Sequence, residues 1–196
     1  AHCVDETSLG ETIANGKEFK VEISNHLQVI DLVITHPDYL SQLRPEVDLA
    51  LLRFKDEVVA PQPLPINESI SELGKIITLI GWGYFGLGTT GRQYDDGEKR
   101  RANNRIIAAD QRLLSFFDDP RVADNAALPL EGTLGLGDSG GPSLITTEDG
   151  LRVAGIAIGE IEGGEYSEET QGRYGSIAIY ERVSIHKNWI NSVLRA

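Results

Sequence analysis

Ser139 lies in the run Gly137-Asp138-Ser139-Gly140-Gly141-Pro142, whose residue types can support nucleophilic catalysis. A serine hydroxyl becomes an effective nucleophile when a base takes its proton and nearby N–H groups stabilise the oxyanion that forms. Glycines allow the backbone around Ser139 to form a tight turn that aims N–H groups at one point. We therefore predict Ser139 as a nucleophile, with an oxyanion hole made by the N–H groups of Gly137 and Ser139.

Two glycine motifs admit other interpretations. The segment Gly137–Gly141 also fits the Gly-x-Ser-x-Gly elbow of α/β-hydrolases, but that motif needs a helix directly after the serine. Here Pro142 and the strand-like run Ser143–Thr147 follow instead. The run Gly81–Gly86 matches the dinucleotide pattern Gly-x-Gly-x-x-Gly, but the polar residues after it do not open a helix, so we predict a strand-to-loop corner.

Two further segments carry a suitable base and carboxylate. The chain opens with Ala1-His2-Cys3, and Val47-Asp48-Leu49-Ala50-Leu51-Leu52 follows. Together with the Ser139 motif, these segments resemble the trypsin/chymotrypsin family of serine proteases in their order and separation. The resemblance covers essentially the whole chain. It implies that His2 is the general base and that Asp48 orients it.

Composition limits the partners and cofactors of the chain. The 196 residues carry a formal net charge of −12, which disfavours nucleic acids and anionic membranes as partners. The four histidines show no metal-ligand spacing, and we expect neither a metal nor a cofactor. Glu11 and Glu18 could contribute to a calcium loop, but a solvated acidic surface is the favoured interpretation.

Short strand-like runs, separated by Gly, Pro, Asn and Asp, predict an all-β barrel or sandwich. The runs are Phe19–Ile23, Val29–Ile34, Leu49–Phe54, Ile76–Ile80, Ser143–Thr147, Val153–Ile158 and Ser176–Tyr180. The polar run Phe85–Asn104 is typical of a long exposed loop. In Ser184–Leu194 the apolar residues follow a helical period, with Ser184 as the expected N-cap.

The family resemblance implies two six-stranded antiparallel Greek-key barrels and a C-terminal helix, with the first barrel incomplete in this chain. Residues 1–62 would form the remainder of the N-terminal barrel, 63–183 the C-terminal barrel and 184–196 the helix. The Pro-rich stretch Pro61–Pro65 is the expected connector.

The beginning of the chain suggests a processed or trimmed product, because the sequence contains no Met. The resemblance implies further strands before His2 and a disulfide partner for Cys3 on one of them. We therefore expect either a second polypeptide that carries the upstream strands or a longer parent sequence.

The resemblance also suggests roles around Ser139. Asp138 would pair with an α-amino group released on activation, and Thr133 would lie at the base of the primary substrate pocket. Because Thr133 is neutral and Ala178 replaces a common glycine, we expect small or medium apolar side chains there. The remaining pocket candidates are Leu134, Leu136, Ile158, Gly159 and Glu160. If Glu160 points into the cleft, basic substrates are favoured instead.

The sequence thus predicts a trypsin-like serine endopeptidase that hydrolyses peptides or proteins through an acyl-enzyme. The resemblance implies a secreted or periplasmic location. The alternative is an inactive zymogen-like fragment or a pseudoprotease that acts as a protein-binding module.

Overall fold

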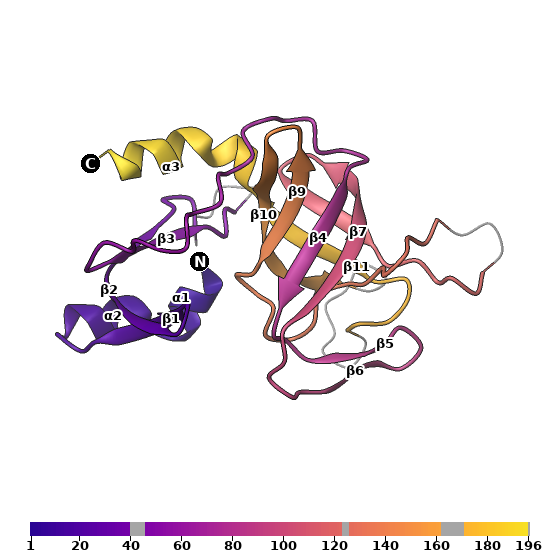
Figure 1. Cartoon of the computed structure of the whole chain (residues 1–196), viewed down its shortest axis with the longest axis horizontal. Helices are drawn as coiled ribbons and strands as arrows, with labels where there is room; N and C mark the ends of the chain where they lie inside the picture. Colours follow the sequence, from indigo (N-terminus) through magenta and orange to yellow (C-terminus); the bar gives the residue numbers. More distant parts are fainter. Residues whose placement is uncertain (40–45, 123–125, 162–170, 196) are drawn as a thin grey trace. The chain divides into compact units, whose positions relative to one another are not determined.

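Antiparallel β-sheet makes up most of the regular structure, which confirms the all-β prediction. The computed structural model describes residues 1–39, 46–122, 126–161 and 171–195. The chain divides into two compact units, Ala1–Leu64 and Pro65–Ala196 (Figure 1).

The first unit contains an antiparallel sheet of three strands in the order β1-β2-β3. The strands are β1 (Phe19–Ile23), β2 (His26–Thr35) and β3 (Ala50–Phe54). Ser24 and Asn25 connect β1 to β2, with φ angles of 50° and 65°. Two consecutive positive φ angles suit a two-residue hairpin, and Asn tolerates this conformation better than most residues. The hairpin sets the register that pairs Ile23 with His26.

Two short helices begin the chain, α1 (His2–Glu6) and α2 (Leu9–Ala14), which we did not predict. Neither has a side-chain N-cap, and Leu9 is their one buried residue. Helices of five and six residues are too short to be stable through propensity alone, so tertiary contacts must hold them. Helix α1 begins at His2, the residue predicted to be the general base.

The second unit is built on a closed barrel in which all paired strands are antiparallel, in the order β10-β11-β8-β7-β4-β9 (Figure 1). Its strands are β4 (Ile76–Gly81), β7 (Arg100–Ala109), β8 (Arg112–Phe116), β9 (Pro142–Thr147), β10 (Gly150–Ile161) and β11 (Ile177–Arg182). The barrel confirms the six-stranded barrel expected for the C-terminal part of the chain.

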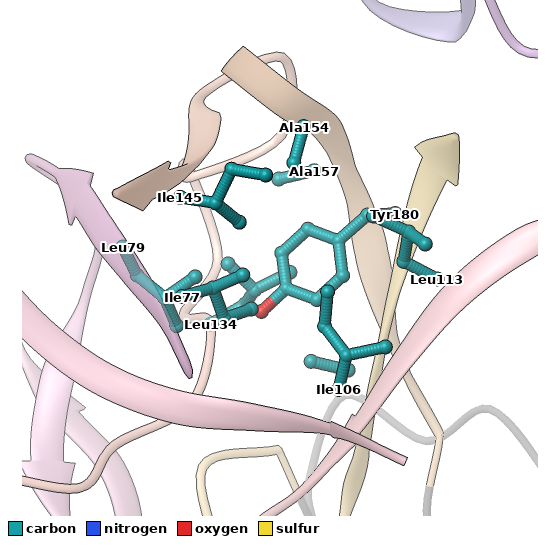
Figure 2. Close-up of a cluster of buried hydrophobic side chains, with 10 residues drawn as sticks. Ile77, Leu79, Ile106, Leu113, Leu134, Ile145, Ala154, Ala157 and Tyr180 are labelled. Atoms are coloured by element: carbon teal, nitrogen blue, oxygen red, sulfur yellow. The ribbon is translucent and has the colours of Figure 1, made fainter. Parts of the chain in front are cut away.

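The hydrophobic core of the second unit fills the barrel. Figure 2 shows the Tyr180 ring at its centre, among side chains from several strands and from the segment before Ser139. The cluster consists of Ile77, Leu79, Ile106, Leu113, Leu134, Ile145, Ala154, Ala157, Ala178 and Tyr180. Because Leu134 belongs to this cluster, the chain just before the Ser139 loop is anchored in the core.

The expectation of a long loop over Phe85–Asn104 is wrong. A hairpin of β5 (Phe85–Leu87) and β6 (Gly91–Tyr94) lies there, and β7 begins at Arg100. The rings of Phe85 and Tyr94 lie 5.6 Å apart, and the Arg100 guanidinium lies 3.6 Å from the Phe85 ring centroid. Aromatic and cation–π contacts therefore order a segment whose composition is typical of a loop.

The C-terminal helix is confirmed, but its predicted start is wrong. A 3₁₀ turn η1 (Val183–His186) precedes α3 (Lys187–Leu194), and the helix has no side-chain N-cap. The Ser184 hydroxyl instead donates to the buried Glu72 carboxylate at 2.5 Å, and Arg182 bonds the same carboxylate at 2.6 Å. The Ser184 hydroxyl is thus oriented by a buried acceptor, and its side chain makes no cap bond to the helix.

Candidate active site

Ser139 lies in the loop that leads into β9, and its side chain is exposed. Its hydroxyl donates a 3.1 Å hydrogen bond to the carbonyl oxygen of Ile158 on β10. Ile158 is the extra residue of a β-bulge, because Ala157 pairs with Tyr180 while Gly159 pairs with Ile179. A bulge redirects the local backbone. The Ile158 carbonyl is thereby available to a side chain outside the barrel ladder.

Backbone hydrogen bonds fix the loop around Ser139. The Gly140 N–H donates to Ala157 at 2.8 Å, and the Gly141 N–H donates to Asp138 at 2.9 Å. Gly137 has a φ of 93°, a conformation that side-chain-bearing residues rarely adopt. Among the described residues, the N–H groups of Gly137 and Ser139 have no hydrogen-bond acceptor. Two N–H donors in one fixed turn can receive a developing negative charge.

The Asp138 carboxylate accepts two backbone hydrogen bonds within the second unit. Its Oδ1 accepts the N–H of Gly83 at 2.8 Å, and its Oδ2 accepts the N–H of Gly135 at 2.8 Å. Only glycines fit around this carboxylate, since a Cβ at Gly81 or Gly83 would lie 2.0 or 2.6 Å from Oδ1. Asp138 thus joins the Ser139 loop to the corner that follows β4.

Replacement of Asp138 by Asn is expected to loosen the Ser139 loop. The amide keeps one acceptor oxygen but presents an NH₂ group to the second backbone N–H, so one charge-assisted bond is lost. We expect the free energy of unfolding of the chain to fall by about 2 kcal/mol. Urea unfolding measures this loss, and exposed Asp149→Asn serves as the control. Equal stabilities of the two variants would contradict the bracing role of Asp138.

His2 and Asp48 form a hydrogen-bonded pair in the first unit. The Nδ1 atom of His2 bonds Oδ2 of Asp48, and the backbone N–H of His2 donates to Oδ1 at 2.8 Å. The Ala1 nitrogen bonds the same Oδ1. Asp48 is only 7% exposed, and its neighbours Val47 and Leu49 are buried as well. A buried carboxylate therefore fixes both the ring and the backbone of His2.

The other ring nitrogen of His2 faces a thiol. The Sγ atom of Cys3 lies 3.4 Å from Nε2 of His2, and Cys3 is a free cysteine in this chain. Since Nδ1 is engaged by Asp48, Nε2 is the nitrogen that remains for proton transfer. The Cys3 thiol occupies one approach to that nitrogen.

The predicted pocket residues occupy different environments. Glu160 is 3% exposed and stands opposite Ala178 in the β10–β11 register. The Thr133 hydroxyl donates to Glu160 at 2.7 Å, so the structure brings these two residues together. Leu134 and Ala178 belong to the barrel core, whereas Leu136 is 40% exposed. A cavity of about 210 Å³ borders Thr133, Leu134 and Asp138.

The sequence model of the trypsin family matches residues 1–190. The chain belongs to the trypsin family. It is similar to tryptase from Mus musculus, with 26% identity over 212 residues that cover 97% of this chain and 72% of the relative. Chymase from Canis lupus familiaris is 26% identical over 205 residues, covering 100% of this chain and 73% of the relative.

A third relative is phenoloxidase-activating factor 3 from Holotrichia diomphalia, 28% identical over 176 residues that cover 85% of this chain and 47% of the relative. Family membership confirms the predicted resemblance and makes this chain a member of a serine protease family.

No helix in the described residues is long and apolar enough to cross a membrane. Within the same residues, no cluster of three or more His, Cys, Asp or Glu could hold a metal ion.

His2 and Asp48 shift each other's pKa. The pKa of His2 rises from 6.5 to about 10, chiefly through the hydrogen bond to Asp48 and also through the Cys3 contact, while partial burial opposes the rise. Burial acts to raise the pKa of Asp48, but hydrogen bonds from His2 and from the Ala1 nitrogen outweigh it. The pKa of Asp48 therefore falls well below its ordinary 3.8.

This coupling predicts how the pair stabilises the chain across the pH range. A raised His2 pKa contributes stability in full below pH 6.5 and loses it as the pH rises through about 10. The lowered Asp48 pKa contributes stability above 3.8 and loses it as the pH falls further. Replacement of His2 by Gln should therefore cost the most free energy of unfolding between pH 3.8 and 6.5.

Chemical denaturation at a series of pH values measures this profile, with exposed His26→Gln as the control. A cost of His2→Gln that stays the same from pH 5 to pH 10 would show that the pair does not form as described.

Sequence reasoning missed several partners of the site. The N–H groups of Gly83 and Gly135 donate to the Asp138 carboxylate, and the sequence did not predict either contact. Ser176 and Gly172 bond Glu160 and were not among the predicted pocket residues. The run Gly81-Trp82-Gly83 could have indicated the first of these, because two glycines beside one Trp suggest a close backbone approach.

Proposed function

We propose that this member of the trypsin family is a serine endopeptidase with Ser139 as nucleophile, His2 as general base and Asp48 as the residue that orients His2. The observation that carries the proposal is the Asp48 carboxylate, which binds both Nδ1 and the backbone N–H of His2. This contact leaves Nε2 as the proton acceptor and stabilises the charged imidazolium that forms during the reaction.

The proposed reaction has two stages. Ser139 Oγ attacks the scissile carbonyl carbon as its proton passes to Nε2 of His2, and the N–H groups of Gly137 and Ser139 receive the oxyanion. The intermediate collapses when the C–N bond breaks and His2 returns the proton to the leaving amine. Water then attacks the ester on Ser139, with His2 again acting as base, and releases the carboxylic acid product.

An activated ester, p-nitrophenyl acetate, tests this scheme because formation of the acyl-enzyme releases a coloured product. The full chain mixed with excess p-nitrophenyl acetate should release a burst of about one p-nitrophenolate per chain, followed by slow turnover. His2→Ala should abolish the burst, whereas His26→Ala should leave it intact. A burst that survives His2→Ala would remove His2 from the role of base.

One observation favours the alternative of an inactive form. The Cys3 thiol lies 3.4 Å from Nε2 of His2, and the hydrogen bond to Asp48 raises the pKa of His2 to about 10, which favours the protonated ring at neutral pH. A protonated imidazole cannot accept the Ser139 proton. In that form the chain would act as a zymogen-like fragment or a protein-binding module. Absence of the ester burst at pH 7 and its recovery at higher pH would identify this state.

Several finer features belong to the same proposal. The substrates would be peptides or proteins, and a second chain could supply strands upstream of His2 and a partner for Cys3. Asp138 would accept an α-amino group on activation, in addition to the two N–H groups that it binds. We propose a secreted or periplasmic location and no cofactor.

A further inference from the structure

Three arginines border the cavity of about 210 Å³ in the second unit. Arg92 lies on β6, and Arg100 and Arg101 are the first two residues of β7. In a chain with a formal net charge of −12, this is a local concentration of positive charge. Like charges around one small space repel each other, whereas an anion among them would be attracted to all three.

Aromatic rings orient two of these guanidinium groups. The Arg100 guanidinium lies 3.6 Å from the Phe85 ring centroid, and the Arg92 guanidinium lies 5.8 Å from the Tyr84 ring centroid. Phe85 and Tyr84 both border the cavity themselves. Arg100 also bonds the two carboxylate oxygens of Asp96 at 2.6 and 2.7 Å, so its charge is already balanced.

The charge of Arg101 is not balanced in this way. Among the described residues, Arg101 makes no hydrogen bond and no ion pair, and it is exposed. The two carboxylates that border the cavity are engaged by backbone groups. Glu131 accepts the N–H groups of Asp118 and Leu128 at 2.7 and 2.5 Å, and Asp138 accepts two others. Arg101 is therefore a cation that can pair with a ligand.

Apolar side chains form another part of the cavity wall. Leu79 and Leu134 belong to the barrel core, and Phe117 is 9% exposed. A volume of about 210 Å³ is smaller than the roughly 300–1,000 Å³ of sites for drug-sized ligands, so the cavity suits a ligand of about one ring. Apolar walls beside an unbalanced cation fit an organic anion better than an inorganic ion, since the apolar body of the ligand is then removed from water.

We propose that this cavity binds a small organic anion, a carboxylate on an aromatic body, and that Arg101 pairs with its charge. Leu134, Asp138 and Pro142 border the same cavity and lie before and after Ser139 in the chain. A bound anion would therefore hold the Ser139 loop against β7. The site does not depend on the proposed peptidase function, because its ligand is neither a substrate nor a reactant.

A comparison of two ligands tests the charge preference of the cavity. Phenylacetate is the anionic probe, and 2-phenylacetamide has nearly the same shape without the charge. Isothermal titration of the full chain should give a dissociation constant for phenylacetate that is at least about 10-fold lower than that for 2-phenylacetamide, because charge-assisted hydrogen bonds are the stronger ones. Equal binding of the two ligands, or binding of neither, would overturn the proposal.

Substitutions on β7 test the role of Arg101. Arg101→Gln should raise the dissociation constant of phenylacetate at least about 10-fold, and Arg101→Lys, which keeps the charge, should recover part of the affinity. Arg105→Gln is the matched control, because Arg105 is exposed on the same strand but is not among the residues that border the cavity. Equal affinity of Arg101→Gln and the parent would reject the assignment of Arg101.

An NMR titration of the unsubstituted chain covers the case in which Arg101→Gln does not fold. Phenylacetate should shift most strongly the backbone amide signals of residues that border the cavity, such as Phe85, Ala102 and Thr133. Shifts centred on another cationic residue, such as Arg53 in the first unit, would overturn the proposal. None of these measurements uses hydrolysis, so a chain that cleaves no peptide would still report whether the anion binds.

Discussion

Replacement of Ser139 by Ala is expected to reduce kcat for peptide hydrolysis by about 10⁶-fold, the size of effect seen when a triad nucleophile is removed. The substitution removes the oxygen atom that would form the acyl-enzyme. Ser139 is exposed, and its hydroxyl makes a single 3.1 Å hydrogen bond, to the carbonyl oxygen of Ile158. The thermal midpoint should therefore change by no more than about 2 °C. Initial rates with a fluorogenic peptide and a thermal melt measure the two quantities.

The control for this substitution is Ser192→Ala, because Ser192 is another hydroxyl with one short local bond, to the Trp189 carbonyl. It should retain the full rate. Residual hydrolysis by Ser139→Ala at the parent rate would assign the activity to another residue or to a contaminating protease.

Replacement of Asp48 by Asn is expected to lower kcat by about 10⁴-fold, as the loss of the triad carboxylate does in this family. The amide can accept the backbone N–H of His2 but cannot both hold Nδ1–H and stabilise a positive ring. The pKa of His2 should fall from about 10, since its largest cause is the bond to Asp48. An NMR titration of the His2 ring measures this change even if the chain is inactive.

Asp31→Asn provides the matched control for Asp48→Asn. Asp31 also accepts two nitrogen donors, but they come from exposed Arg53 on the same sheet. It should leave both kcat and the His2 titration unchanged. A His2 pKa that is the same in Asp48→Asn and in the parent would show that the carboxylate does not orient the ring.

Sequence alone suggested the candidate triad because His2, Asp48 and Ser139 each lie in a short, distinctive segment. The glycines around Ser139 indicate positions where φ is positive, as it is at Gly137 with a φ of 93°. The partners of these residues were harder to predict. Asp138 bonds Gly83, 55 residues earlier in the chain, and such a contact depends on how β4 and β9 pair.

The fold was predictable where strands are largely apolar, as in β4 and β9. It was not predictable in β7 and β8, which contain polar residues at buried positions such as Asn104 and Ser115. Asn104 is satisfied by the Gly132 carbonyl at 2.8 Å, a partner that composition cannot reveal. Ser184 illustrates the same limit. The sequence predicts it as a helix N-cap, but its hydroxyl donates to the buried Glu72 carboxylate instead.

Labelling with a fluorophosphonate probe tests the central claim most directly, because the probe reacts only with a serine activated by its base and oxyanion donors. The full chain is treated with the probe, digested and analysed by peptide mass spectrometry, with Ser139→Ala as the control. The account predicts one adduct per chain, on Ser139, and none in the control. An unlabelled chain at every pH up to 10, or a label on another residue, would contradict it.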